Sequence, residues 1–395
     1  MIKEFNFASI PHIIFGAGKL IELNDIIPQF GNEVLFIIGG SSLKNSGNWE
    51  KIQDQMMENS INYSSESIQT EPSPSIVDHI AGKYRKKRVD VVIGIGGGSV
   101  TDAAKAISAM IPKKDSIKNY LEGVGTKIHD GQKIPYIAIP TTSGTGSEAT
   151  KNAVISQIGP NGFKKSLRHD NLIPNYAIID PELMVSCPPS VTSSCGLDAF
   201  TQLLEAYTSN KANPMTDALA FSGMNAMKDS IILASTTGAA NVEIRSSMAY
   251  GSLMSGITLA NAGLGIIHGL ASPIGGYFHI PHGVVCGTLL AESTKMNVNK
   301  LIEQGSSGLP YLKKFGLIGA LFEGKMTIEN SQAEEYALTL IKILEMWTEE
   351  LSIARLGNYG INEKDAYKIV EKSGLKNNPA ALKKEDIETI VLNRL

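Results

Sequence analysis

Residues 89–107 read Val89-Asp-Val-Val-Ile-Gly94-Ile-Gly96-Gly97-Gly98-Ser99-Val-Thr-Asp102-Ala-Ala-Lys105-Ala-Ile107. An apolar, β-branched run of strand length breaks at a glycine cluster and passes into an alanine-rich helical pattern. The segment predicts a strand, a tight turn and a helix start. Glycines let a ligand approach the backbone, and a helix N-terminus offers free N–H groups to an anion such as phosphate. A tight turn without a ligand is the alternative, because G-x-G-G-G-S departs from the dinucleotide fingerprint G-x-G-x-x-G.

The apolar run from Val34 to Ile38 reads as a strand buried on both faces, and the run from Tyr136 to Pro140 reads as another strand. Helical patterns separate the strands, which predicts βαβ units and a doubly wound, Rossmann-like parallel sheet. The run ending at Pro140 leads into residues 141–148, which are dense in hydroxyl groups and glycines. Loops at the carboxyl edge of such a sheet bind ligands, whereas a Ser/Thr-rich surface turn is the alternative.

Beyond Ser190 the strand-like runs nearly vanish and helical periodicity takes over. Long helices are predicted near residues 192–209, 214–229, 242–262, 266–275, 282–296, 332–351 and 385–395. An edge strand or hairpin is expected within residues 5–16, and short strands near residues 152–156 and 177–180. We expect an α/β dinucleotide-binding domain over residues 1–185 and an all-helical domain over residues 186–395.

Composition excludes several classes of protein. The chain has 395 residues and a net charge of −3, and its basic residues do not collect on one face. Nucleic acid is therefore not an expected partner. No segment has the length and apolarity of a membrane span and no signal sequence opens the chain, so we expect a cytoplasmic protein without membrane contact. The three cysteines match no disulfide framework and are expected to be small buried side chains.

One set of side chains in the helical half is suited to a metal. Asp198 and Gln202 lie four residues apart on one predicted helix, so they share a face. His268 and His282 each precede a glycine, which leaves the imidazoles accessible. A carboxylate, two imidazoles and an amide oxygen suit Fe(II) or Zn(II) with an open position for a substrate. From spacing alone, purely structural histidines are the alternative.

Several motifs in this order resemble the iron-containing (group III) alcohol dehydrogenase family. They are Phe15-Gly-Ala-Gly18, Gly96-Gly-Gly-Ser99-Val-Thr-Asp102-Ala-Ala-Lys105, Pro140-Thr-Thr-Ser-Gly-Thr-Gly-Ser-Glu148, Ile179-Asp-Pro-Glu-Leu183, Gly196-Leu-Asp198-Ala199, Ala262-Gly-Leu-Gly265 and Pro281-His282-Gly283. The resemblance implies a dehydroquinate synthase-like architecture with the active site in the cleft between the two domains. It also implies an NAD(P)-dependent oxidoreductase that interconverts a small alcohol with its aldehyde or ketone. A divalent metal would polarise the substrate oxygen.

The resemblance assigns roles to individual residues. Asp198, His268 and His282 match three of the family's four metal ligands, and Gln202 stands where the family has a histidine. An amide oxygen is a poorer ligand than imidazole, so this departure is expected to affect the affinity for the metal or its identity. The resemblance implies Fe(II) as the metal, with Zn(II) as the alternative. Ser272 stands where many members have a second active-site histidine, so the proton relay passes to Ser272, to water or to the cofactor ribose.

The resemblance also implies a cofactor site. Three of its residues, Gly97, Gly98 and Ser99, would hold the pyrophosphate. The remaining expected cofactor residues are Gly39, Gly40, Ser41, Asp102, Thr141, Thr142, Thr145 and Lys164. The loop after the first strand carries no acid that would repel a 2′-phosphate, so NADP is favoured over NAD.

Three hypotheses follow. The first is the metal-assisted dehydrogenase, expected as a homodimer or higher homo-oligomer. The second is a nucleotide-binding homologue without turnover, which the departures at Gln202 and Ser272 motivate. The third is lyase chemistry of the dehydroquinate-synthase kind, which needs a basic cluster near the metal ligands; none is evident in the sequence, so this hypothesis ranks last.

Overall fold

The first half of the chain is built on a parallel sheet. The structure, a computed structural model, describes residues 4–159 and 162–395. Six strands follow the order β1-β8-β5-β4-β2-β3, and every neighbouring pair is parallel. Their bounds are β1 His12–Phe15, β2 Glu33–Ile38, β3 Asn62–Ser67, β4 Val91–Gly96, β5 Tyr136–Pro140 and β8 Tyr176–Ile179. The predicted parallel sheet is confirmed, with β1 as an edge strand.

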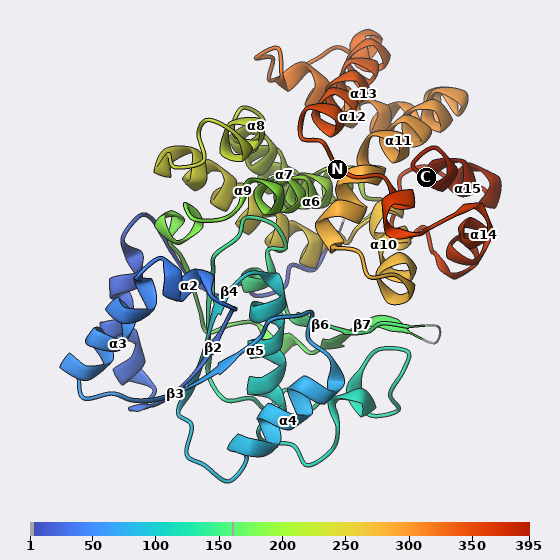
Figure 1. Ribbon diagram of the computed structural model, residues 1–395. Coiled ribbons are helices and arrows are strands. Elements are labelled where there is room, and N and C mark those ends of the chain that lie inside the picture. The colour runs from blue at the N-terminus through green and yellow to red at the C-terminus, as the bar shows by residue number, and fades with distance from the viewer. Residues whose placement is uncertain (1–3, 160–161) are drawn as a thin grey trace.

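Helices cover both faces of this sheet (Figure 1). On one face, Leu35 and Ile37 of β2 pack with α4 (Pro74–Tyr84) and α5 (Gly98–Met110). On the other face, Val34 and Phe36 pack with α1 (Leu23–Ile26) and α3 (Asn48–Glu58). Side chains alternate between the faces of a strand, so burial on both sides explains why these strands are continuously apolar.

The strand order places a crevice at one point of the sheet. The chain passes from β2 outward to β3 and then returns across β2 to β4, so the direction of winding reverses between β2 and β4. In open α/β sheets ligands bind outside the carboxyl ends of the strands at such a reversal. The loops that leave β2 and β4 at this point begin at Gly39 and Gly97.

The second half of the described chain is helical and packs above the carboxyl edge of the sheet in Figure 1. Its helices are α6 Pro189–Thr208, α7 Pro214–Met227, α8 Ser230–Ser235, α9 Val242–Ala262, α10 Ile266–Tyr277, α11 His282–Glu303, α12 Leu309–Leu321, α13 Ala333–Glu350, α14 Glu363–Lys372 and α15 Lys384–Leu392. The predicted helical half is confirmed. Its division from the first half at residue 185 stays a prediction.

Several elements are absent from the sequence-based prediction, among them one strand and two helices of the second half. β7 (Phe163–Arg168) pairs antiparallel with β6 (Asn152–Gln157) in a separate sheet, and most of its side chains are not fully buried. α12 contains glycines that disfavour a helix, yet a Cβ on Gly319 would lie 1.9 Å from the carbonyl oxygen of Tyr336. Those glycines allow α12 and α13 to approach closely. α14 is short and mostly charged.

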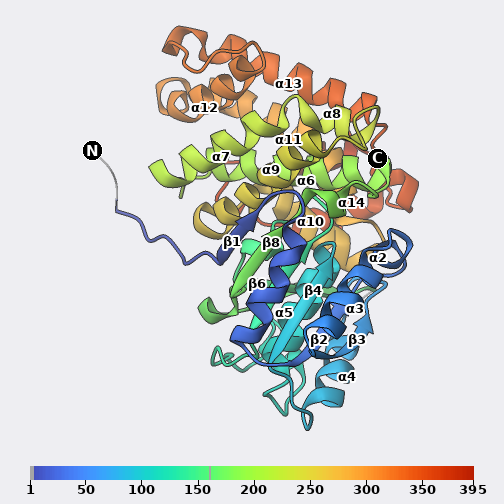
Figure 2. The same cartoon turned by 90° about the vertical axis from the view of Figure 1, so that its left-hand side faces the viewer.

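Two further features concern the ends and the apolar helices. Figure 2 shows the segment ahead of β1 extending outward toward the N-terminus. Closer to β1 this segment still contacts the helical half, because the backbone N–H of Ala8 donates to Asn261 Oδ1 of α9 at 2.6 Å. Within the described residues, no single helix is long and apolar enough to cross a membrane. Only α9 and α10 taken together pass that test, and they are bent by 99° at the break between them.

Candidate active site

The N-terminus of α5 lies at the crevice between β2 and β4. Its N-cap is Gly97, whose backbone is extended, and no side chain caps the helix. The first-turn N–H groups of a helix without a cap are available to an anion, and the helix dipole favours negative charge there. This geometry supports the prediction that Gly97, Gly98 and Ser99 hold a pyrophosphate.

The loop after β5 closes over this glycine turn. The N–H of Thr141 donates to the carbonyl oxygen of Gly96 at 3.0 Å. A Cβ on Gly98 would lie 2.5 Å from Thr145 Cγ2, and one on Gly97 would lie 3.3 Å from Thr142 Cγ2. The approach of the two loops therefore requires glycine at residue 98, whereas a Cβ at residue 97 would need only a small shift of Thr142.

The loop after β2 lies beside the same helix turn. A Cβ built on Gly39 would contact Val100 of α5 at 3.7 Å. Gly40 and Ser41 follow and are exposed, and α2 (Ser42–Asn45) begins immediately after them. The predicted cofactor residues of three loops thus converge at one end of α5.

Asp102 occupies a different kind of position from the other predicted cofactor residues. Its carboxylate accepts from Ser147 Oγ at 2.5 Å and from the N–H of Val154 at 3.1 Å. One turn away, the buried Lys105 ammonium donates to the carbonyl oxygens of Ser147 and Asn152 at 2.7 and 2.8 Å. Asp102 therefore joins α5 to the threonine loop and to β6 through a buried polar network.

Three helices bring the predicted metal ligands together. Asp198 lies on α6, His268 on α10 and His282 on α11. Asp198 Oδ1 is 3.3 Å from His268 Nε2 and 3.7 Å from His282 Nε2. A fourth side chain, Cys286, completes the cluster, and one donor atom from each of the four residues lies within 4.8 Å of the others.

This cluster fits a divalent metal. Asp198 is 2% exposed, and its Oδ1 atom is buried without a hydrogen-bond partner. Burial alone would raise the pKa of Asp198, but the facing imidazoles of His282 and His268 hold it well below its usual range. Burial lowers the pKa of His282 to about 4, which leaves this imidazole neutral at pH 7. A buried, unpaired carboxylate oxygen surrounded by nitrogen donors is suited to a cation.

Glu205 orients one of these imidazoles. Nδ1–H of His268 donates to Glu205 Oε2 at 2.7 Å, and the N–H of Ile267 donates to Glu205 Oε1 at 2.7 Å. The carboxylate fixes the tautomer of His268, so that Nε2 faces Asp198. The sequence alone assigns no role to Glu205, because its partner is 63 residues away.

Replacing Glu205 with glutamine is therefore expected to weaken metal binding by about 10- to 100-fold, because the outer partner of a ligating histidine is lost. Competition of the purified protein against a chelator of known affinity measures this change. Glu243→Gln, an exposed residue of α9, is the matched control. An unchanged metal affinity in Glu205→Gln would contradict this role.

Gln202 contacts the cluster through its amide nitrogen. Nε2 donates to Asp198 Oδ2 at 3.1 Å, while Oε1 accepts from Ser255 Oγ at 2.8 Å. The reversed amide would place two oxygens 3.1 Å apart, which is unfavourable next to an ionised carboxylate. In this arrangement the group of Gln202 that faces Asp198 is the NH₂ donor, which has no lone pair to offer a metal.

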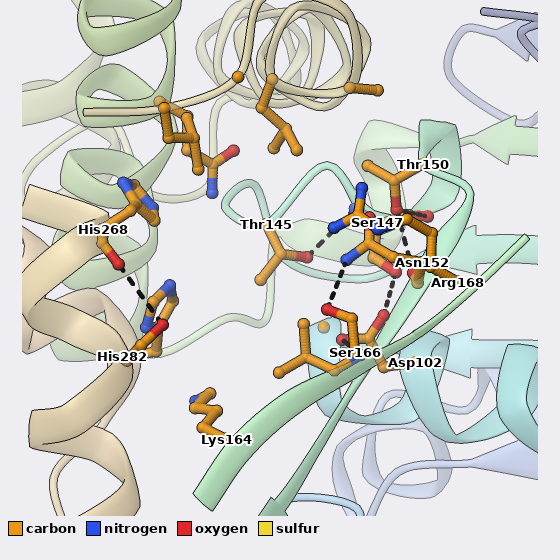
Figure 3. A pocket seen from close by; sticks show the side chains of 18 of the residues that line it. Asp102, Thr145, Ser147, Thr150, Asn152, Lys164, Ser166, Arg168, His268 and His282 are labelled. Carbon is orange, nitrogen blue, oxygen red and sulfur yellow. Dashed lines mark hydrogen bonds between the residues drawn. The ribbon is translucent and has the colours of Figure 1, made fainter. Parts of the chain in front are cut away.

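A cavity of about 660 Å³ joins the two sets of residues. Gly98, Ser99, Asp102 and Thr145 line it from the α/β half, and His268 and His282 line it from the helical half (Figure 3).

Three further predicted residues, Lys164, Gln202 and Ser272, lie on this cavity. Lys164 of β7 lines it and pairs with Glu71 at 2.6 Å, whereas the neighbouring Lys165 is exposed. Ser272 also lines it, one turn after His268 on α10. Among the described residues, the rest of the predicted cofactor set lies outside this lining.

The expectation that no basic cluster lies near the metal ligands is wrong. Lys164, Arg168, Lys211 and Lys376 line the same cavity as the two histidines. They come from β7, from the segment after α6 and from the segment after α14, so their proximity is a product of folding that spacing does not reveal. The charge of the cavity therefore does not exclude the lyase hypothesis. Comparison with known proteins decides between the lyase and the metal-assisted dehydrogenase.

Models of known families match nearly the whole chain. The family model described as iron-containing alcohol dehydrogenase matches residues 11–181, and the C-terminal model of the same family matches residues 192–395. The chain belongs to the iron-containing alcohol dehydrogenase family. This iron-containing alcohol dehydrogenase is 30% identical to alcohol dehydrogenase 4 of Saccharomyces cerevisiae over 389 residues, which covers 96% of each chain. It is 36% identical to 1-propanol dehydrogenase of Citrobacter freundii over 297 residues, which covers 75% of this chain and 74% of the relative.

Solved structures agree with this assignment. An alcohol dehydrogenase from Oenococcus oeni superposes with a TM-score of 0.86 at 25% identity, covering 99% of this chain and 100% of the other. The dehydroquinate synthase-like fold of the family is confirmed. The chain is an NAD(P)-dependent oxidoreductase of the alcohol dehydrogenase type, so neither the lyase nor the homologue without turnover is favoured.

Proposed function

We propose that this iron-containing alcohol dehydrogenase reduces a small aldehyde or ketone, and oxidises the corresponding alcohol, with NADP as the preferred cofactor. The observation that carries the proposal is the shared cavity. The N-terminus of α5, suited to a pyrophosphate, lines one space of about 660 Å³ together with His268 and His282, two members of the cluster that Asp198 completes. A cofactor lying on α5 would direct its nicotinamide toward a substrate beside that cluster.

The proposed roles follow from position. Asp198, His268 and His282 would hold a divalent metal, which supplies Lewis-acid stabilisation of negative charge on the substrate oxygen. Glu205 keeps the imidazole of His268 oriented. Ser272, on the cavity wall one turn from His268, is placed to relay a proton to that oxygen, together with water or the cofactor ribose.

The preference for NADP rests on the loop after β2. Gly40 and Ser41 carry no charge there, and Lys44 is exposed on the adjoining α2. An acidic side chain at this position would hydrogen-bond the ribose hydroxyls of NAD and repel the 2′-phosphate of NADP. The neutral loop with a nearby cation favours the phosphate. We also propose that the enzyme works as a homo-oligomer, which sedimentation of the purified protein tests.

The substitution Ser41→Asp is expected to raise the KM for NADPH at least tenfold while leaving the KM for NADH within about threefold, because a new carboxylate repels the 2′-phosphate. Initial rates of aldehyde reduction with each cofactor measure the change. Ser41→Asn is the control of equal size without charge. Wild-type enzyme that uses NADH better than NADPH would overturn the preference, and no turnover with either cofactor would overturn the proposed function.

A further inference from the structure

We propose that Cys286, and not Gln202, is the fourth protein ligand of the metal site, and that the thiolate makes the site selective for zinc over iron. The inference rests on the proposed metal role of Asp198, His268 and His282. It concerns the one position where this chain carries glutamine in place of the histidine that the family resemblance predicts.

The geometry of α11 places Cys286 beside two of the proposed metal ligands. Cys286 follows His282 by four residues on one helix, so the two side chains share a face one turn apart. Cys286 Sγ is 3.7 Å from His268 Nε2 and 3.8 Å from His282 Nε2. The thiol is completely buried, and it is surrounded by the other donors of the cluster.

Both polar groups of the Gln202 side chain are already engaged in hydrogen bonds. Its carbonyl oxygen is held by Ser255, and its NH₂ group donates to Asp198 Oδ2. A ligand must present a lone pair to the metal, and the nitrogen of an amide presents hydrogens. Gln202 therefore acts as a positioning residue that fixes one oxygen of Asp198 by a hydrogen bond.

One carboxylate oxygen of Asp198 is free to bind a metal. Because Gln202 engages Oδ2, the buried atom without a hydrogen-bond partner is Oδ1, and this is the atom that faces both imidazoles. Cys286 Sγ lies within 4.8 Å of a carboxylate oxygen of Asp198 and of both imidazoles. The unpaired oxygen, two imidazole nitrogens and one sulfur thus form a compact set of four donors.

The chemistry of this set determines the metal preference. A set of one carboxylate, two imidazoles and one thiolate combines ligand types that zinc accepts. Soft thiolate ligands favour zinc over the harder divalent metals, and a coordinating thiol binds as the thiolate, releasing its proton to solvent. A ligand on α11 has in effect replaced one expected on α6, which explains how the chain tolerates glutamine at residue 202.

The test loads metal-depleted protein with Co(II) under anaerobic conditions and records the near-ultraviolet thiolate-to-cobalt charge-transfer band, with bound cobalt measured by elemental analysis. We expect the band in the wild type, in Gln202→Leu and in the control Cys187→Ser, and its loss in Cys286→Ser. Wild-type protein that binds one equivalent of Co(II) without the band would overturn the role of Cys286.

A second measurement does not depend on any variant folding. X-ray absorption of zinc-loaded wild-type protein is expected to show one sulfur at about 2.3 Å from the metal. Titration of the wild type with Zn(II) and Fe(II) should give at least tenfold tighter binding of zinc. A first shell of nitrogen and oxygen alone would reject Cys286 while leaving the proposed metal site intact. Failure to bind either metal would reject both.

Discussion

Replacing Asp198 with asparagine is expected to lower kcat/KM for aldehyde reduction by roughly a thousandfold, which corresponds to about 4 kcal/mol of transition-state stabilisation. Of the three ligands Asp198, His268 and His282, only Asp198 carries a negative charge. An amide of nearly the same shape removes that charge, so both metal affinity and charge stabilisation at the substrate oxygen should fall.

The matched control is Asp54→Asn, an exposed carboxylate on α3 that is remote in sequence from the cluster. Steady-state kinetics and metal content are measured on the same preparations, and circular dichroism shows that each variant is folded. If Asp198→Asn kept more than a tenth of the wild-type kcat/KM at full metal content, the proposed role of this residue would fail.

Replacing Lys105 with methionine is expected to lower the free energy of unfolding by about 3–5 kcal/mol. Lys105 is completely buried, and its ammonium donates to Ser147, Thr150 and Asn152. Burial lowers its pKa to about 8, and the nearby Asp102 opposes that shift. Methionine fills a similar volume, but it leaves buried carbonyl oxygens and the Asp102 carboxylate without a compensating cation.

Urea unfolding followed by circular dichroism measures this loss. Lys51→Met on the exposed side of α3 is the control, with an expected change within about 0.5 kcal/mol. The double variant Lys105→Met with Asp102→Asn should lose less than the sum of the two single variants, because both partners of the charged pair are then removed. Strict additivity, or a loss below 1 kcal/mol for Lys105→Met, would contradict the network.

The parts of the fold that sequence reasoning predicts are those with a strong local signal. The apolar run before Gly97 and the alanine-rich helix after it are correctly assigned, because strand and helix periods are both visible within about ten residues of one another. The order of strands and helices then predicts the parallel sheet. α9, predicted as residues 242–262, has those bounds in the structure.

The parts that sequence reasoning misses depend on contacts between distant residues. The sequence gives no sign that Lys105 is buried, although Ser147 and Asn152 accept hydrogen bonds from its ammonium group. Cys286 reads as a small buried side chain, since only the meeting of α10 and α11 places it beside His268. The spacing of His282 and Cys286 on one predicted helix is the one signal in the sequence that would have indicated the thiol.

The most direct test of the account is reduction of short aldehydes with NADPH by protein that has been stripped of metal and reconstituted anaerobically with Zn(II), Fe(II) or no metal. We predict negligible activity without metal and restoration by added metal, with NADPH preferred to NADH in parallel assays. Equal activity with and without metal would contradict the claim that a cation held by the cluster on α6, α10 and α11 would assist the reaction by stabilising negative charge on the substrate oxygen.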